Sequence, residues 1–231
     1  MAKNKRSRVK TWAWRICLTL GLVLGLAMVF NEQIKLFIVN QMTQSTMKTV
    51  TKDSVKANQK KAASYDFDAV EALDLTTVSK AMMDGSKDAI GMLAVPSVNI
   101  HVPVMQGVSN AHMAVGAGTL KPNQQMGEGN YALAGHSVQT SGTILSELHS
   151  VQVGDLIYLT DMTKVYTYKA ILRTRIDMSQ VSVIDDVPGK KLITLITCET
   201  LTSSSKDRVY VRGELQSVTD ATDKTIKVFE K

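Results

Sequence analysis

The sequence predicts an all-β domain, folded as a closed barrel or a sandwich, behind an N-terminal membrane helix and a partly helical stalk. Three observations support this fold class. An uncharged apolar run follows a basic N-terminus, residues 31–90 contain no proline, and the rest of the chain alternates strand-like runs with turn residues. A chain of 231 residues can hold one membrane segment and one domain with a full hydrophobic core.

The positive charge is concentrated at the N-terminus. Six of the 27 lysines and arginines lie in residues 1–15, which contain no acid and which we expect to form a cytoplasmic tail. The remainder has 21 basic residues against 21 acidic ones, so its formal charge is zero. A basic face for nucleic acid is therefore not expected.

The first expected element is a transmembrane helix over residues 16–30, which contain no charged side chain. Trp12 and Trp14 stand where an interfacial aromatic belt would lie, and Arg15 can snorkel toward the headgroups. The positive-inside rule then places the N-terminus in the cytoplasm and the domain outside the cell. A cleaved signal peptide ending near Ala27 is the alternative, but the apolar run continues beyond that position.

Residues 31–88 are expected to form an extracellular stalk, and residues 89–231 the main domain. The stalk segment lacks proline and has one glycine, whereas all four prolines and 11 of the 14 glycines lie between residues 91 and 213. Apolar residues at near-helical spacing predict one packing helix around residues 67–78.

Short β-rich runs rich in Val, Ile, Tyr and Thr follow the stalk. The predicted strands are 91–100, 102–108, 131–134, 155–160, 165–177, 191–197 and 209–218. Residues 161–164 predict a hairpin turn, and short helical inserts are expected at 111–115 and 143–151.

Two cysteines occur, and Cys17 lies within the apolar N-terminal run. Cys198 stands at the end of a predicted strand, which is a rigid position for a nucleophile. A buried core cysteine or an intermolecular disulfide would also account for a lone thiol in an extracellular domain.

A nucleophilic thiol needs a group that manages protons, and His136 is the best candidate because it also follows an apolar strand. His101, His112 and His149 are expected to have surface or packing roles. The spacing of histidines and cysteines does not resemble a metal site, so no catalytic metal is expected. Arg208 could supply donors to an oxyanion, although other arginines of the domain are equivalent by residue type alone.

Taken together, these residues resemble the sortase family. Thr194-Leu195-Ile196-Thr197-Cys198 is similar to its T-L-x-T-C signature, His136 matches its A-x-H histidine, and Arg208 matches its R-x-x-V arginine. The order and spacing also agree, with Cys198 62 positions after His136 and Arg208 ten positions later. The resemblance extends from about Gly91 to Leu215, including residues 115–120 and 181–184.

The resemblance implies an eight-stranded β-barrel and cysteine transpeptidation in a Gram-positive bacterium. Cys198 would cleave an L-P-x-T-G sorting signal of a surface protein after its threonine, forming a thioester. His136 would be general acid and base, and Arg208 would stabilise the oxyanion or orient the substrate. A peptidoglycan precursor such as lipid II would supply the acceptor amine.

The resemblance also implies a subclass. A pilus-type sortase is expected to carry an Asp-Pro-aromatic lid, but no proline precedes Pro96, so the housekeeping class A type fits better. Some class A members bind calcium. The corresponding positions here are Lys121, Gln124, Glu128 and Asp186, of which two are not acidic, so calcium activation is not expected and no cofactor is predicted.

The substrate groove implied by the resemblance is apolar. Its matching positions are Leu120, Ala134, Val181, Val183, Ile184, Ile196 and Thr197, for which plain core packing is the alternative. Two competing functions remain at this point: a papain-like or amidase hydrolase, which usually presents its cysteine before its histidine, and a membrane-tethered adhesin or scaffold in which Cys198 is inert.

Overall fold

A computed structural model describes residues 3–67, 69–71, 73–85, 87–137, 143–198 and 207–230, and for residues 3–8 and Cys198 it describes the backbone alone. The chain divides into two compact units, Met1–Phe37 and Ile38–Lys231. Each is described by itself.

The first unit contains helix α1 (Lys3–Val29) and the beginning of α2 (Asn31–Met47). Val9–Val29 is 21 residues long and apolar enough to cross a membrane. At a rise of about 1.5 Å per residue this segment is roughly 30 Å long, the thickness of the hydrocarbon core of a bilayer. The predicted apolar N-terminal helix is therefore confirmed.

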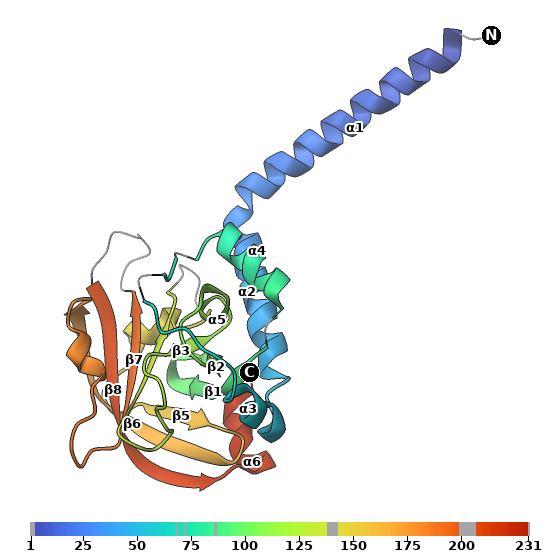
Figure 1. Cartoon of the computed structure of the whole chain (residues 1–231). Helices are drawn as coiled ribbons and strands as arrows, with labels where there is room; N and C mark the ends of the chain where they lie inside the picture. Colours follow the sequence, from blue (N-terminus) through green and yellow to red (C-terminus); the bar gives the residue numbers. More distant parts are fainter. Residues whose placement is uncertain are drawn as a thin grey trace. The chain divides into compact units, whose positions relative to one another are not determined.

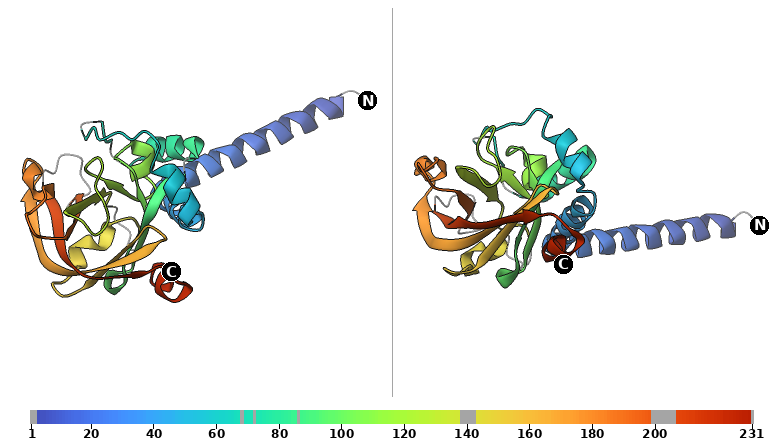
Figure 2. Two further views of the ribbon diagram at one scale, coloured as in Figure 1. Left: turned by 60° about the horizontal axis from the view of Figure 1, so that its bottom comes forward. Right: turned by 90° about the horizontal axis from the view of Figure 1, so that it is seen from below.

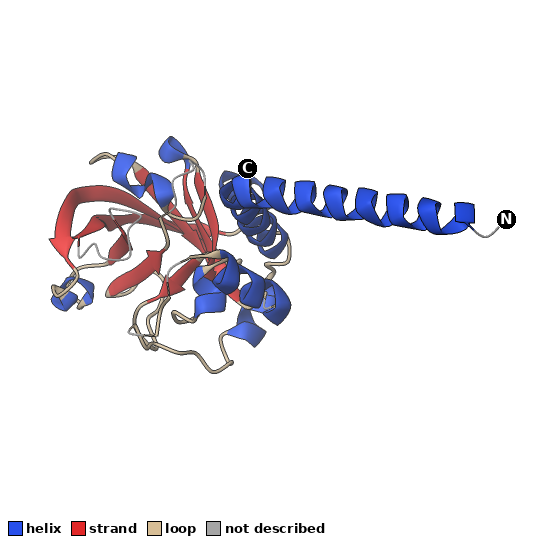
Figure 3. Cartoon of the chain, turned by 90° about the horizontal axis from the view of Figure 1, so that it is seen from above, coloured by secondary structure: helices blue, strands red, loops and turns tan. Residues whose placement is uncertain are grey.

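The second unit is built on a closed barrel whose strands follow the order β1-β2-β3-β4-β7-β8-β6-β5 (Figure 1). This arrangement, seen among the described residues, confirms the predicted eight-stranded barrel. The strands are β1 (Ala89–Val95), β2 (Ile100–Met105), β3 (Ala117–Thr119), β4 (Asn130–Gly135), β5 (Leu156–Thr160), β6 (Lys164–Asp177), β7 (Leu192–Cys198) and β8 (Asp207–Asp220). Figure 3 shows the short helices at the periphery of the strands. The β2–β3 and β4–β7 pairs are parallel, whereas the others are antiparallel.

Alternate side chains of the central strands fill the barrel. Successive residues of a strand point to opposite faces of the sheet, so the inward positions are every second residue. These positions are fully or almost fully buried in one hydrophobic core, and they include Tyr131 and Leu133 of β4, Ile193 and Leu195 of β7, and Val209 and Val211 of β8. The intervening positions of these three strands face the other side of the sheet.

Two local features differ from the sequence-based expectation. The predicted strand 91–100 is interrupted by a 3-10 turn, η1 (Pro96–Val98), because proline lacks the N–H that a strand ladder needs. The helix expected around residues 67–78 is α4 (Leu75–Asp84). It starts later because Asp74 caps it, accepting a hydrogen bond from the Thr77 N–H at 2.8 Å.

Helices cover one side of the barrel (Figure 2). The end of α2 contributes Val39 to the core, and its Thr43 hydroxyl donates to the Val115 carbonyl at 2.6 Å. A second hydrophobic cluster joins α3 (Lys52–Asn58), β1, α6 (Asp223–Ile226) and η4 (Lys227–Phe229), with Phe229 buried in it. Residues 38–88 thus lie in the same compact unit as the barrel, while an extracellular position for the segment stays a prediction.

The two expected helical inserts are present as short helices. They are α5 (Asn110–Met113) and the 3-10 helix η2 (Ser146–Ser150). A further 3-10 helix, η3 (Val181–Ile184), precedes β7 and carries three of the residues predicted to line the groove.

Candidate active site

The adjacent strands β4, β7 and β8 bring the three predicted catalytic positions to one level of the barrel. In the parallel β4–β7 pair Gly135 is opposite Thr197, so the next positions in register are His136 and Cys198. In the antiparallel β7–β8 pair Cys198 is opposite Arg208. Because β4 and β7 run parallel and end at the same edge, the position of His136 is next to that of Cys198. The antiparallel strand β8 brings the position of Arg208 to the other side of Cys198.

Buried threonines of β7 hold the β4–β7 register. The Thr197 hydroxyl donates to the Gly135 carbonyl at 2.7 Å, directly before His136. The Thr194 hydroxyl donates to the side-chain oxygen of Asn130 at 2.8 Å. Both threonines are almost fully buried, so each bond satisfies a polar group that has lost its water. The Thr197 bond therefore aligns the end of β4 directly before His136, whereas the Thr194 bond joins β7 to Asn130 at the start of β4.

The side chains beside Cys198 are partly accessible. His136 is half-buried, and its carbonyl accepts a hydrogen bond from the Leu145 N–H at 3.3 Å. Arg208 is also half-buried, and one guanidinium nitrogen donates to the Asp207 carbonyl at 3.1 Å. A second guanidinium nitrogen lies 4.0 Å from the Met178 sulfur. The Cys198 side chain lies outside the described part of the chain.

Four of the predicted groove residues share one hydrophobic cluster. Ala134 and Ile196 come from the outward positions of β4 and β7, Leu120 follows β3, and Ile184 ends η3. Ala134, Ile184 and Ile196 are only partly buried, so this cluster leaves apolar surface next to the three predicted catalytic positions. Such surface suits an apolar peptide side chain.

The other three predicted groove residues are placed differently. Val181 is 65% exposed. Val183 is half-buried, and its carbonyl accepts hydrogen bonds from Asn130 and Arg212. Thr197 occupies the inward face of β7, where its hydroxyl is bonded to β4.

Sequence reasoning did not select the four other members of this cluster, Val70, Val108, Met113 and Ala132. Val70 belongs to the segment before α4, whose main-chain carbonyls accept hydrogen bonds from residues around α5. The Val108 N–H donates to the Ser64 carbonyl at 2.8 Å, and the Asn110 side-chain amide donates to the Ala69 carbonyl at 3.3 Å. One sequence signal existed for Val70, its helical spacing, and that spacing placed it in a packing helix rather than beside the predicted groove.

The positions aligned with a calcium site do not form an acidic pocket. Lys121 Nζ lies 2.6 Å from Asp186 Oδ1, and the Gln124 amide donates to the Ala132 carbonyl at 2.9 Å. The hydrogen bond from Lys121, followed by that from the Asn130 N–H, lowers the pKa of Asp186 below its ordinary value. A lysine ammonium thus occupies the place where a cation would need acidic ligands, and these residues do not fit a calcium ion.

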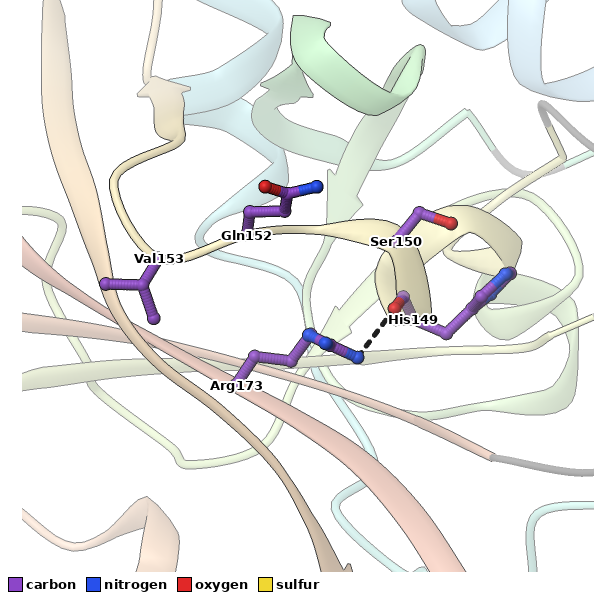
Figure 4. A pocket seen from close by; sticks show the side chains of 5 residues that line it. All are labelled: His149, Ser150, Gln152, Val153 and Arg173. Atoms are coloured by element: carbon purple, nitrogen blue, oxygen red, sulfur yellow. Dashed lines mark hydrogen bonds between the residues drawn. The ribbon is translucent and has the colours of Figure 1, made fainter.

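The remaining histidines lie away from these three positions in sequence and on other elements. The His112 ring contacts the Gln106 carbonyl at 2.9 Å, and the His149 ring contacts the Ser146 carbonyl at 2.8 Å. A polar surface pocket of about 650 Å³ lies beside His149 and is lined by His149, Ser150, Gln152, Val153 and Arg173 (Figure 4). Arg173 donates to the His149 carbonyl there at 2.9 Å.

A thiol, an imidazole and a guanidinium on neighbouring strands can together perform nucleophilic acyl transfer. The thiolate is the nucleophile, imidazole exchanges protons near neutral pH, and guanidinium offers fixed donors to an oxyanion. The adjoining apolar surface could hold the peptide that is cleaved.

Comparisons with known proteins agree with this arrangement. The sortase domain family model matches residues 93–216. Sortase A of Streptococcus agalactiae is 35% identical over 94% of this chain and 91% of its own length. Sortase A of Listeria monocytogenes is 37% identical over 90% of this chain and 92% of its own.

Solved structures give the same result. The crystal structure of Listeria monocytogenes sortase A superposes with a TM-score of 0.60 and 36% identity, covering 62% of this chain and 98% of that one. These similarities favour a transpeptidase over a non-catalytic adhesin or scaffold. The chain therefore belongs to the sortase family and is a cysteine transpeptidase of the class A type.

Proposed function

We propose that this sortase cleaves L-P-x-T-G sorting signals after the threonine and transfers the surface protein to the amine of a peptidoglycan precursor such as lipid II. The observation that supports the proposal is the register of β4, β7 and β8, in which the residue before His136 is opposite the residue before Cys198, and Cys198 is opposite Arg208. The partly exposed apolar cluster of Ala134, Ile184 and Ile196 supplies a surface for the signal.

In this mechanism the Cys198 sulfur attacks the threonine carbonyl. The C–N bond to glycine breaks, and His136 gives a proton to the departing amine. The acceptor amine then loses a proton to His136 and attacks the thioester, so that a new amide forms and the thiolate leaves. Arg208 donates hydrogen bonds to the oxyanion of each tetrahedral intermediate.

The proposed enzyme works without calcium or another cofactor. The Lys121–Asp186 ion pair joins the segment after β3 to the segment before β7, a link that a bound cation could otherwise provide. Addition of a chelator to the purified protein is expected to leave turnover unchanged. A calcium-dependent increase in turnover would contradict this part of the proposal.

The proposed location is the cell membrane, with one span, a cytoplasmic N-terminus and the catalytic domain facing the cell wall. The basic tail and the apolar Val9–Val29 segment support this orientation. Protease added to intact protoplasts should digest the domain and spare an N-terminal epitope tag. Protection of the domain would reverse the orientation.

The proposed reaction is tested with the full chain in detergent, an L-P-x-T-G peptide and an amine acceptor, followed by intact-mass spectrometry. We expect a thioester adduct on Cys198 and an amine-dependent product in which the threonine carbonyl is joined to the acceptor amine. Cys198→Ala should abolish both, whereas the matched variant Cys17→Ala should retain them. A folded wild-type protein that forms no adduct with a panel of related motifs would overturn the proposal.

A further inference from the structure

A second row of polar side chains runs across the same three strands, below the catalytic level. Asn130 starts β4, while Thr194 lies in β7 four residues before Cys198 and is opposite Arg212 in β8. At about 3.3 Å per residue, four residues separate Thr194 from Cys198 by roughly 13 Å along the strand. This row lies outside the catalytic positions and outside the apolar cluster, so the mechanism above leaves it without a role.

Asn130 is buried, with 1% of its surface exposed, and both polar atoms of its side chain are hydrogen-bonded. Its oxygen accepts from the Thr194 hydroxyl at 2.8 Å. Its amide nitrogen donates to the Val183 and Asp185 carbonyls, both at 3.1 Å. The Asn130 N–H also donates to Asp186 Oδ1 at 2.8 Å. One residue thus joins the barrel strand β7 to η3 and to the two residues after it.

Arg212 holds the same carbonyl from another strand. Its guanidinium donates to the Val183 oxygen at 3.0 Å and lies 5.3 Å from the centre of the Tyr210 ring. Stacking on an aromatic ring fixes the direction of the planar guanidinium. The Val183 carbonyl therefore receives one donor from β4 and one from β8, which uses both of its lone pairs.

The segment held in this way is short and largely exposed. The helix η3 is a single 3-10 turn, and Val181 at its start is 65% exposed. Its last residue, Ile184, is partly buried against the cluster that contains Ala134 and Ile196. A short 3-10 turn with weak internal hydrogen bonds depends on outside partners for its position. The carbonyls that accept those outside hydrogen bonds belong to Val183 and Asp185, which are the residues directly before and after Ile184.

We propose that Asn130 is a positioning residue for the sorting signal, acting with Arg212 to hold η3 so that Ile184 completes the apolar surface. This inference rests on the proposed function, because it assigns that surface to the signal peptide. Asn130 contacts neither Cys198 nor His136 in the hydrogen bonds described above, so its loss should weaken substrate binding more than chemistry.

The test compares Asn130→Ala with Asn58→Ala in the full chain. Asn58 is a matched control because it is also buried and donates to a main-chain carbonyl, that of Ala89 at 3.0 Å, but it lies in α3. Asn130→Ala should raise KM for the sorting peptide about tenfold, as expected for loss of the two bonds to the Val183 and Asp185 carbonyls, with kcat changed by less than about threefold. Asn58→Ala should leave KM within about twofold while lowering the melting temperature.

Hydrogen exchange supplies a measurement that does not depend on turnover. Amides of residues 181–187 should exchange at least about tenfold faster in Asn130→Ala, whereas Asn58→Ala leaves them unchanged. If Asn130→Ala does not fold, Arg212→Met removes only the second donor and should give the same two effects at about a third of the size.

Two results would overturn the inference. One is an unchanged KM with unchanged exchange in the folded variants. The other is a loss confined to kcat, which would assign Asn130 to the catalytic centre. A wild-type protein that leaves the peptide uncleaved would reject the proposed function instead, and the exchange experiment would still decide whether Asn130 holds η3.

Discussion

The Thr197 hydroxyl donates a 2.7 Å hydrogen bond to the Gly135 carbonyl, which joins the residue before Cys198 to the residue before His136. The bond is buried and crosses the parallel β4–β7 pair at its last paired position. It therefore fixes one strand end against the other directly before the proposed nucleophile and base.

Replacing Thr197 tests this alignment. Thr197→Val keeps the shape but leaves the Gly135 carbonyl without its hydroxyl donor, which should cost about 1–3 kcal/mol of unfolding free energy. We expect kcat to fall about tenfold because the histidine can shift relative to the cysteine. Thr197→Ser retains the hydroxyl and should behave like the wild type. Steady-state kinetics and urea unfolding measure both effects, and full kcat in the valine variant would contradict the alignment role.

The role of Arg208 depends on its planar set of donors. Arg208→Lys keeps the charge but loses the paired N–H groups, so kcat should fall on the order of a hundredfold, as for loss of an oxyanion donor. Arg175→Lys is the control, since Arg175 lies on the neighbouring strand β6, opposite Val209. Thioester formation measured by rapid-quench mass spectrometry reports the step. Normal turnover by Arg208→Lys would show that the assigned role is wrong.

The Lys121–Asp186 pair predicts how peptide binding responds to pH and to salt. The pKa of Asp186 is lowered from the ordinary aspartate pKa of about 3.9, so the carboxylate stays ionised down to that pH. Its contribution is lost only as pH falls further. The pair should therefore contribute a constant amount between about pH 5 and 8. Because the Asp186 side chain is 66% exposed, high salt should weaken the pair.

Asp186→Asn separates this contribution from general surface charge. It should raise KM a few-fold at low salt and much less at high salt, as expected for a screened ion pair. Asp220→Asn is the matched control, because Asp220 forms an exposed pair with Lys164 at 2.6 Å on the β6–β8 ladder. An equal change of KM in both variants would contradict a specific role of Asp186 in peptide binding.

Gly116 tests the close approach of β2 and β3. A Cβ at this position would lie 2.2 Å from the Pro103 carbonyl oxygen, so Gly116→Ala must push the two segments apart. We expect a loss of several degrees in melting temperature, corresponding to about 2 kcal/mol or more. Gly189→Ala is the comparison: its φ of +74° is unfavourable for alanine, but nothing lies within 4 Å of the added carbon, so only a modest loss of about 1 kcal/mol is expected. Scanning calorimetry of both variants measures the difference.

The sequence predicted the barrel well because its core strands alternate strongly. Tyr131 and Leu133, or Ile193 and Leu195, follow the period of two that a half-buried strand requires. The three-residue strand β3 was not among the predicted strands, because Ala117-Gly118-Thr119 carries almost no β signal and pairs through its backbone. Helix boundaries also shifted where a single capping residue, Asp74, decided them.

The candidate site was predictable only in part. The residue types and order of His136, Cys198 and Arg208 pointed to their chemistry, and the register now places them on neighbouring strands. Asn130 could not be selected, since a polar residue at the start of an apolar run reads as a turn residue. Val70 was assigned to a helix because of its helical spacing. That spacing does not reveal that its neighbour Ala69 is bonded to Asn110, about forty residues away in the sequence.

Closure of the barrel also determines how a peptide can be recognised. A sheet with an exposed edge can accept an extended peptide as an additional strand, through main-chain hydrogen bonds that are insensitive to sequence. The described strands form a closed ring, so β4 and β7 have neighbours on both sides and offer no such edge. A sorting signal must then lie across the outer face and be read by its side chains. Replacing its amides with N-methyl groups should therefore be tolerated better than changing its leucine or proline.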